Sequence, residues 1–118
     1  MRFLCLVYGN EKDLETLARG ELATLKRDSL DYDETLKQSG HFIAAHALQP
    51  TRTARTIRVR GEKILQTDGP FAETKEQLGG FILIDARDMD EATALASKIP
   101  MARVWMVEVR PVATITRD

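Results

Sequence analysis

Apolar residues alternate with polar ones, or run together, in four short segments that predict the strands of a sheet: residues 2–8, 41–48, 81–85 and 102–110. The first segment is apolar on both faces, with Phe3, Cys5 and Val7 on one and Leu4, Leu6 and Tyr8 on the other. Residues 81–85 show the same two-sided pattern. Both faces of the sheet therefore need cover.

Residues 21–39 show the spacing of an amphipathic helix. The apolar or small positions three and four apart are Leu22, Leu25, Ser29, Tyr32 and Leu36. We expect a short helix capped by Asn10 before it, an interruption at Gly20 and an end at Gly40. The opposite face predicts a solvated, mixed-charge surface without chemistry, made of Lys26, Arg27, Asp33, Glu34 and Lys37.

A second helix is predicted after Asp88, which with Glu91 forms a variant of the capping box. Its apolar positions are Ala92, Leu95, Ala96 and Ile99, and Pro100 ends it. Two helices can shield only one face of such a sheet. Because the strands are apolar on both faces, the simplest cover for the other face is a second subunit, and the pattern predicts a homodimer.

Residues 54–60 and 63–67 predict a β-hairpin across Gly61 and Glu62. Its cations, Arg55, Arg58, Arg60 and Lys63, are typical of an edge strand protected from accidental pairing. No aromatic residues are interleaved with them, which disfavours nucleic-acid binding. Anion binding by one of these side chains stays open.

The composition narrows the class of protein. At 118 residues the chain has room for one domain, and 17 basic against 18 acidic residues predict no attraction to nucleic acid or to an anionic membrane. Cys5 has no partner for an internal disulfide. Neither a signal peptide nor an apolar span of about 18 residues is present, so we expect a cytoplasmic protein.

Motifs for cofactors are missing from the sequence. It contains no glycine-rich phosphate loop, no GxSxG turn and no cysteine-pair metal motif, so we predict no cofactor. His41 and His46 are five residues apart on one strand and face opposite ways. They therefore predict no shared metal site.

The most specific stretch is residues 67–86, TDGPFAETKEQLGGFILIDA. Asp68, Gly69 and Pro70 predict a rigid turn, because proline fixes its own φ and restricts the residue before it. Ionisable side chains follow at once, namely Glu73, Lys75 and Glu76. The stretch is either a well-formed turn with a solvated charged rim or a loop that faces a ligand.

An acid–base set is the candidate chemistry. His46 and Asp68 are the predicted catalytic pair in a cleft beside the turn, because a histidine next to a carboxylate can act as a general base. The predicted ligand-binding neighbours are Tyr8, Arg58, Phe71, Glu73, Lys75 and Glu76. The small residues Ala45 and Ala47 beside His46 leave room for a ligand or for close packing. A buried hydrogen-bond network that holds the loop explains the same residues.

The sequence resembles the DGPF subgroup of the YCII-related proteins over nearly its whole length. The resemblance rests on TDGPFAETKEQLGGF at residues 67–81, supported by YG at 8–9, ALQP at 47–50, TIRVR at 56–60, DMDEA at 88–92 and EVRPV at 108–112. It implies an α+β fold, a ferredoxin-like βαββαβ sandwich with an additional β-hairpin, paired into a dimeric α+β barrel. Relatives commonly carry glutamate where this chain has His46, and glycine where it has Trp105. We expect Trp105 to narrow a nearby cleft.

The resemblance implies no established reaction. The histidine–aspartate dyad of some YCII-related proteins has its histidine on the first helix, and no histidine occurs in residues 11–40 here. We expect the protein to bind or transform a small polar metabolite. The alternative is a non-enzymatic partner of an extracytoplasmic-function sigma factor, because genes of such relatives often lie beside genes of these factors.

Overall fold

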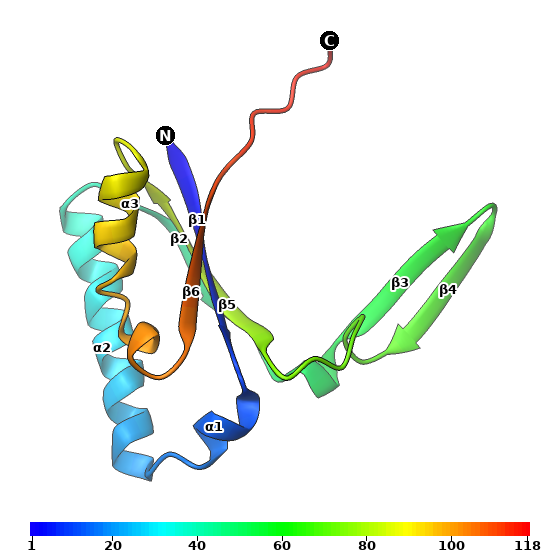
Figure 1. Cartoon of the computed structure of the whole chain (residues 1–118), viewed down its shortest axis with the longest axis horizontal. Helices are drawn as coiled ribbons and strands as arrows, with labels where there is room; N and C mark the ends of the chain where they lie inside the picture. Colours follow the sequence, from blue (N-terminus) through cyan, green and yellow to red (C-terminus); the bar gives the residue numbers. More distant parts are fainter.

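The computed structural model describes residues 1–118 and combines a central sheet with helices on one side and a projecting hairpin on the other (Figure 1). The elements in order are β1 (Arg2–Gly9), α1 (Glu11–Glu15), α2 (Arg19–Gln38), β2 (Phe42–Ala47), the 3₁₀ turn η1 (Thr51–Thr53), β3 (Arg55–Arg60), β4 (Lys63–Asp68), β5 (Gln77–Asp85), α3 (Met89–Ala96), the 3₁₀ turn η2 (Pro100–Arg103) and β6 (Met106–Pro111).

The central sheet has four strands in the order β2-β5-β1-β6, and every neighbouring pair is antiparallel. Helix α2 connects β1 to β2, and α3 connects β5 to β6. This is the strand order of a ferredoxin-like βαββαβ sandwich, with β3 and β4 inserted between β2 and β5. The predicted α+β fold with an additional hairpin is confirmed.

The hydrophobic core lies between the sheet and the two longer helices. Phe3 and Cys5 of β1 are fully buried, and Ile84 of β5 is 1% exposed. Leu36 of α2 and Ala92 of α3 pack on the same cluster. We call this side of the sheet the covered face.

The other side, the open face, has no helix against it (Figure 1). The strand register places seven apolar side chains there: Ala44, Leu4, Leu6, Tyr8, Leu78, Phe81 and Leu83. The register of β2 shifts between Phe42 and Ala44, so Phe42 packs on the core cluster and not beside Ala44. The predicted strict alternation of β2 was wrong at this point.

The observed limits of one helix and one strand differ from the limits predicted from the sequence. Helix α2 runs through Gly20 in its first turn instead of stopping there, because an early turn tolerates glycine. Strand β6 begins at Met106 and not at residue 102, since Pro100 opens the turn η2. Both predicted N-caps are confirmed: Lys12 N donates to Asn10 Oδ1 at 3.0 Å, and Glu91 N donates to Asp88 Oδ1 at 2.9 Å.

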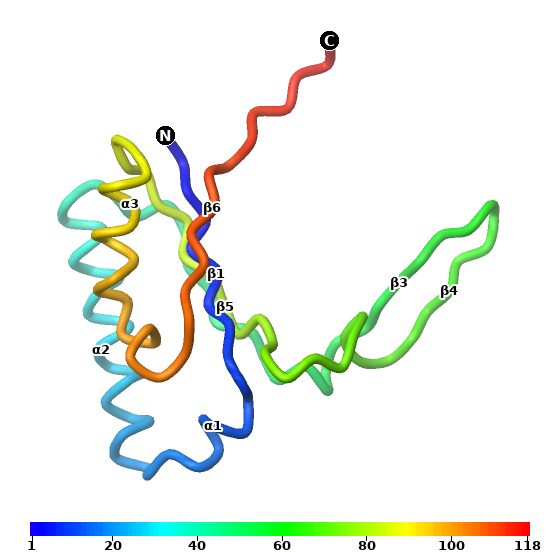
Figure 2. The backbone as a smooth tube through the Cα atoms, in the orientation of Figure 1, coloured from blue at the N-terminus to red at the C-terminus, as the bar shows by residue number.

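The hairpin of β3 and β4, which we call the arm, forms its own two-stranded sheet and pairs with no other strand. It leaves the body beside η1 and points away from it, and the residues after β6 also run outward (Figure 2). The arm was predicted as a protected edge of a sheet. It is instead a separate projection, because the connections at η1 and before β5 carry it away from the central strands.

Candidate functional site

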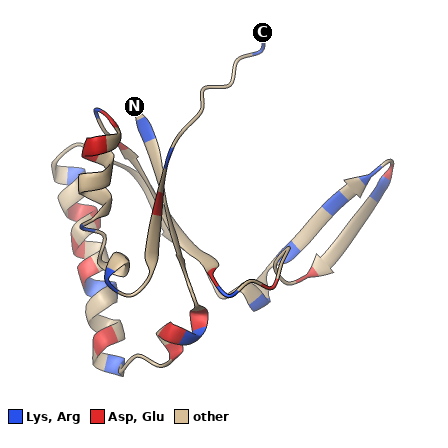
Figure 3. Cartoon of the chain, in the orientation of Figure 1, with Lys and Arg blue, Asp and Glu red and all other residues tan.

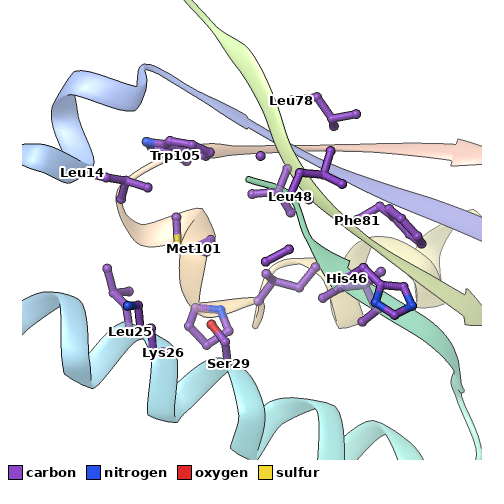
Figure 4. A pocket seen from close by; sticks show the side chains of 18 of the residues that line it. Leu14, Leu25, Lys26, Ser29, His46, Leu48, Leu78, Phe81, Met101 and Trp105 are labelled. Carbon is purple, nitrogen blue, oxygen red and sulfur yellow. The ribbon is translucent and has the colours of Figure 1, made fainter. Parts of the chain in front are cut away.

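A cavity of about 730 Å³ opens between α2 and the end of the sheet that leads to α1 (Figure 4). More than half of its lining residues are hydrophobic. Leu25 and Ser29 of α2 form one wall, and the sheet contributes Ala45, Ala47 and Gly80 from its covered face. The space beside the small alanines, predicted next to His46, therefore lies on the helix side of the sheet.

Trp105 closes one end of this cavity. Its indole ring occupies the space that side chains would need at Gly9 and Gly79, since a Cβ on either glycine would collide with the ring. The Nε1 atom is buried and donates no hydrogen bond. The ring thus occupies space at this end of the cavity, and the expectation that it narrows the cleft compared with relatives stays a prediction.

Polar groups line the cavity from α2. Lys26, Tyr32 and Asp33 all border it, and the Tyr32 hydroxyl donates to Leu95 O at 2.6 Å. Burial raises the pKa of the Asp33 carboxyl above its ordinary value, although the nearby Lys37 opposes this effect. Lys26 is exposed, as predicted for the solvated face of α2, whereas Asp33 is half-buried at the border of the cavity.

The helical spacing itself contained the signal that sequence reasoning missed. Lys26 and Asp33 each follow a position of the apolar stripe, Leu25 or Tyr32, by one residue. Such flanking positions lie at the border of a buried stripe, where a side chain reaches either solvent or a cavity. Sequence alone does not say which, because the cavity depends on how far α2 stands from the sheet.

Glu11 joins two segments of the cavity wall through hydrogen bonds. Its carboxylate accepts from Thr51 N at 3.2 Å and from Thr51 Oγ1 at 2.5 Å. These bonds join α1 to the connection between β2 and β3. Glu11, Gln49 and Pro50 all border the cavity, so this network holds one side of it in place.

His46 lies beside Phe81 on the neighbouring strand, and their rings meet edge to face with centroids 5.8 Å apart. The β2–β5 register places both side chains on the open face, and Figure 4 shows the two labelled rings near each other. Tyr8 shares this face. Two of the predicted site residues therefore share the open face, but only His46 borders the cavity, and neither lies in a cleft with the turn.

Asp68 lies at the root of the arm. Its carboxylate is 3.4 Å from Arg55 Nε, and its side chain is 87% exposed. The adjacent Gly69 has a φ of +102°, which glycine adopts at little cost. Gly69 N donates to Ala54 O at 2.7 Å, and Thr56 Oγ1 donates to Gly69 O at 3.0 Å. These two hydrogen bonds join the DGP turn to the start of the arm, and the rigidity of the turn stays a prediction.

The remaining predicted residues lie along the arm and the loop that follows. Arg58 and Phe71 border a small recess of about 220 Å³ on the arm, with Thr56, Leu65, Thr67 and Pro70. Glu73, Lys75 and Glu76 are exposed. Gln77 Nε2 donates to Thr74 O at 2.9 Å and so holds this loop against the start of β5.

Within one chain, the structure does not bring His46 and Asp68 together. His46 borders the large cavity, which Asp68 does not line, and the two residues come from separate sheets. The predicted single cleft containing both residues is absent from the chain, because the arm carries Asp68 away from the body. No group of three or more His, Cys, Asp or Glu side chains is placed to hold a metal ion.

The family model for the YCII-related domain matches residues 1–116. The chain belongs to the YCII-related family. An uncharacterized protein of Rhizobium meliloti (strain 1021) is 35% identical over 115 residues, which make up 96% of this chain and 93% of that protein. The narrower assignment to the DGPF subgroup stays a prediction.

A solved structure supports the fold of this YCII-related protein. It is the 5-chloro-2-hydroxyhydroquinone dehydrochlorinase of Burkholderia phenoliruptrix, in complex with 2,5-dihydroxybenzoquinone, with a TM-score of 0.56. The two chains are 16% identical, and the match covers 96% of this chain and 94% of that one. The longest helix, α2, is too polar to cross a lipid bilayer, and no other helix is long enough.

Proposed function

We propose that this YCII-related protein binds a small organic molecule in the cavity between α2 and the sheet. The observation that carries the proposal is the cavity itself, because about 730 Å³ is a typical volume for a ligand site. The cavity is open to solvent on one side, so a ligand could enter it without unfolding of the chain. A space of this size bordered by ionisable groups is therefore suited to a ligand.

The lining favours an amphipathic ligand over the small polar metabolite expected from the sequence. Leu25, Ala45 and Ile82 would contact an apolar body, while Lys26 and Asp33 would meet a polar end near α2. The related fold solved with a dihydroxybenzoquinone makes hydroxylated ring compounds the first set to test. Asp33 is the carboxyl best placed to exchange a proton with such a ligand, because it borders the cavity and burial raises its pKa above the ordinary value.

The roles predicted for His46 and Asp68 stay predictions. Neither residue has the other as a neighbour within the chain, so an acid–base pair would need another arrangement of subunits. The regulatory alternative, a sigma-factor partner, has no observation in its favour in the structure or among the relatives. We therefore place small-molecule binding first.

The test is a thermal-shift screen of hydroxylated aromatic and quinone compounds, with a matched pair of variants. Ala45→Leu fills the cavity from the covered face, whereas Ala44→Leu adds the same atoms to the open face. A ligand at a hundred times its Kd stabilises the wild-type fold by about 2.7 kcal/mol. Ala45→Leu should abolish the shift and Ala44→Leu should retain it. Equal shifts in both variants, or no shift with any compound, would overturn the proposal.

We also propose that two chains associate through their open faces. Leu4, Phe81 and Leu83 form an apolar surface there that a monomer would leave in water. Light scattering at micromolar concentration should give twice the mass of one 13.3 kDa chain. Leu4→Glu should give a folded monomer, because a carboxylate would be buried without a partner in the interface.

A further inference from the structure

The two faces of the arm differ in chemistry. The β3–β4 register pairs Ile57 with Gln66 and Val59 with Ile64, so three β-branched apolar side chains share one face. Ile57, Val59 and Ile64 are 60%, 58% and 66% exposed. The opposite face carries Arg58, Arg60, Lys63, Leu65 and the two threonines of the small recess.

Nothing in the chain covers the apolar face of the arm. Of all residues in β3 and β4, Thr56 alone is not exposed. An isolated two-stranded hairpin is at best marginally stable in water. The arm nevertheless contains regular pairing over six positions, from Arg55 opposite Asp68 to Arg60 opposite Lys63. Such a hairpin needs a surface to pack against.

The size of the exposed surface indicates how large that missing contact is. The chain exposes 8860 Å², whereas a compact protein of 13.3 kDa exposes about 6,450 Å². Its radius of gyration is 16.4 Å, against about 13.5 Å for a compact domain of this length. The excess surface is about 2,400 Å², to which the arm and the exposed residues 112–118 both contribute, and it lies at the upper end of what each chain of a permanent dimer buries.

Charge points to a second copy as the partner. The arm, residues 55–68, carries four basic and two acidic residues, a net charge of +2, so the rest of the chain has a net charge of −3. Figure 3 shows mainly basic residues along the arm and mainly acidic ones on α1 and α3, whereas α2 carries both kinds. Opposite net charges on the arm and on the rest of the chain would favour contact between the arm of one subunit and the body of the other in a two-fold symmetric dimer.

We propose that the face of the arm formed by Ile57, Val59 and Ile64 packs against the body of a second copy of this chain. The inference rests on the homodimer proposed above and adds a second contact to its open-face interface. The DGP turn acts as the root of this arm, because Gly69 and its bonds to Ala54 and Thr56 fix the direction in which β4 ends. The motif is thus a positioning element for the contact between subunits.

A pair of neighbouring residues provides the test. Ile64→Asn removes an apolar side chain from the proposed contact, and Leu65→Asn makes the same change on the other face of the same strand. The Kd of the dimer, measured by sedimentation over a dilution series, should rise at least tenfold for Ile64→Asn. It should change less than threefold for Leu65→Asn. The double variant Ile57→Asn/Ile64→Asn should weaken the dimer further.

The outcomes separate this inference from the dimer proposal. If Leu4→Glu dissociates the dimer while Ile64→Asn leaves its Kd unchanged, the arm contact is wrong and the open-face dimer stands. If the wild-type chain is a monomer, both proposals fail. Equal effects of Ile64→Asn and Leu65→Asn would also overturn the arm contact. Backbone amide exchange in β3 and β4 gives a second readout, because it should be slow in the dimer and fast in the Leu4→Glu monomer.

Discussion

The covered face of the sheet and the arm are built from the same kinds of residue and end in opposite environments. Phe3, Cys5 and Ile84 are at most 1% exposed under the helices, whereas Ile57, Val59 and Ile64 are 58–66% exposed on the arm. Alternating β-branched and apolar residues therefore specify a strand in both places. Whether the strand is buried depends on the element that the chain supplies to cover it.

The exposure of the open face lies between that of the covered face and that of the arm. Its two central strands, β5 and β1, pair with a strand on each side, but no helix lies over this face of the sheet (Figure 1). The chain thus completes one interface by itself and leaves two apolar surfaces for association. Substitutions that remove equal side chains from these surfaces measure how far each depends on a partner.

The largest effect should come from a matched pair of phenylalanines. Phe3→Ala empties a fully buried site on the covered face and should cost about 3–5 kcal/mol of the free energy of unfolding at every protein concentration. Phe81→Ala on the open face should cost less than half as much at nanomolar concentration, where the chain is dissociated. Its cost should rise at micromolar concentration, where the partner covers Phe81. Urea unfolding at the two concentrations measures this, and a concentration-independent cost for Phe81→Ala would contradict the open-face interface.

The next effect tests the end of the covered side, where Trp105 fills the space beside two glycines. Gly79→Ala should destabilise the fold by about 1–3 kcal/mol, because the added methyl group overlaps the indole ring. In a Trp105→Ala background, the same substitution should cost much less. A double-mutant cycle by chemical denaturation gives the coupling between the two sites. Additive costs would mean that the ring does not occupy this space.

The sequence predicted the central fold correctly because its signals are local or are repeated along each element. The two-sided apolar pattern of residues 2–8 predicted a strand, and β1 occupies Arg2–Gly9. The caps at Asn10 and Asp88 depend on only a few neighbouring residues. The family was also correct, since its motifs cover nearly the whole chain.

The site could not be predicted in the same way. The distance between His46 and Asp68 depends on the direction in which the arm leaves the body, and no pattern within residues 54–70 encodes that direction. The cavity depends on the separation of α2 from the sheet, which small residues such as Ala45 and Gly80 allow but do not specify. Spatial relations between elements were therefore the part that sequence patterns left undetermined.

A smaller effect is expected in the pH dependence of unfolding, which reports the burial of Cys5 on the covered face. Burial raises the pKa of the Cys5 thiol from 9.0 to about 11, so the folded state holds its proton more tightly than the unfolded state. The stability contribution is complete below pH 9 and is lost as the pH rises toward 11. By pH 10, the free energy of unfolding should have fallen by about 1.4 kcal/mol because of this thiol. Comparing unfolding at pH 8 and pH 10 in wild type and Cys5→Ala isolates this effect, which the variant should lack.

The smallest effect concerns the carboxyl at the cavity. Because burial raises the pKa of Asp33, its ionised form is held less favourably in the folded chain than in water. Asp33→Asn should therefore raise the Tm at pH 7 slightly, by roughly one or two degrees, and this advantage should shrink as the pH falls through the raised pKa and the wild-type carboxyl takes up its proton. Asp31→Asn on the exposed side of the same helix is the control and should leave the Tm unchanged. A ligand that donates a hydrogen bond to the Asp33 carboxylate would reverse the order of Tm between wild type and variant. That result would show that this carboxyl serves binding.

If Asp33→Asn lowered the Tm without ligand at pH 7, the carboxylate would instead be supporting the fold, and its assignment to the ligand site would be wrong.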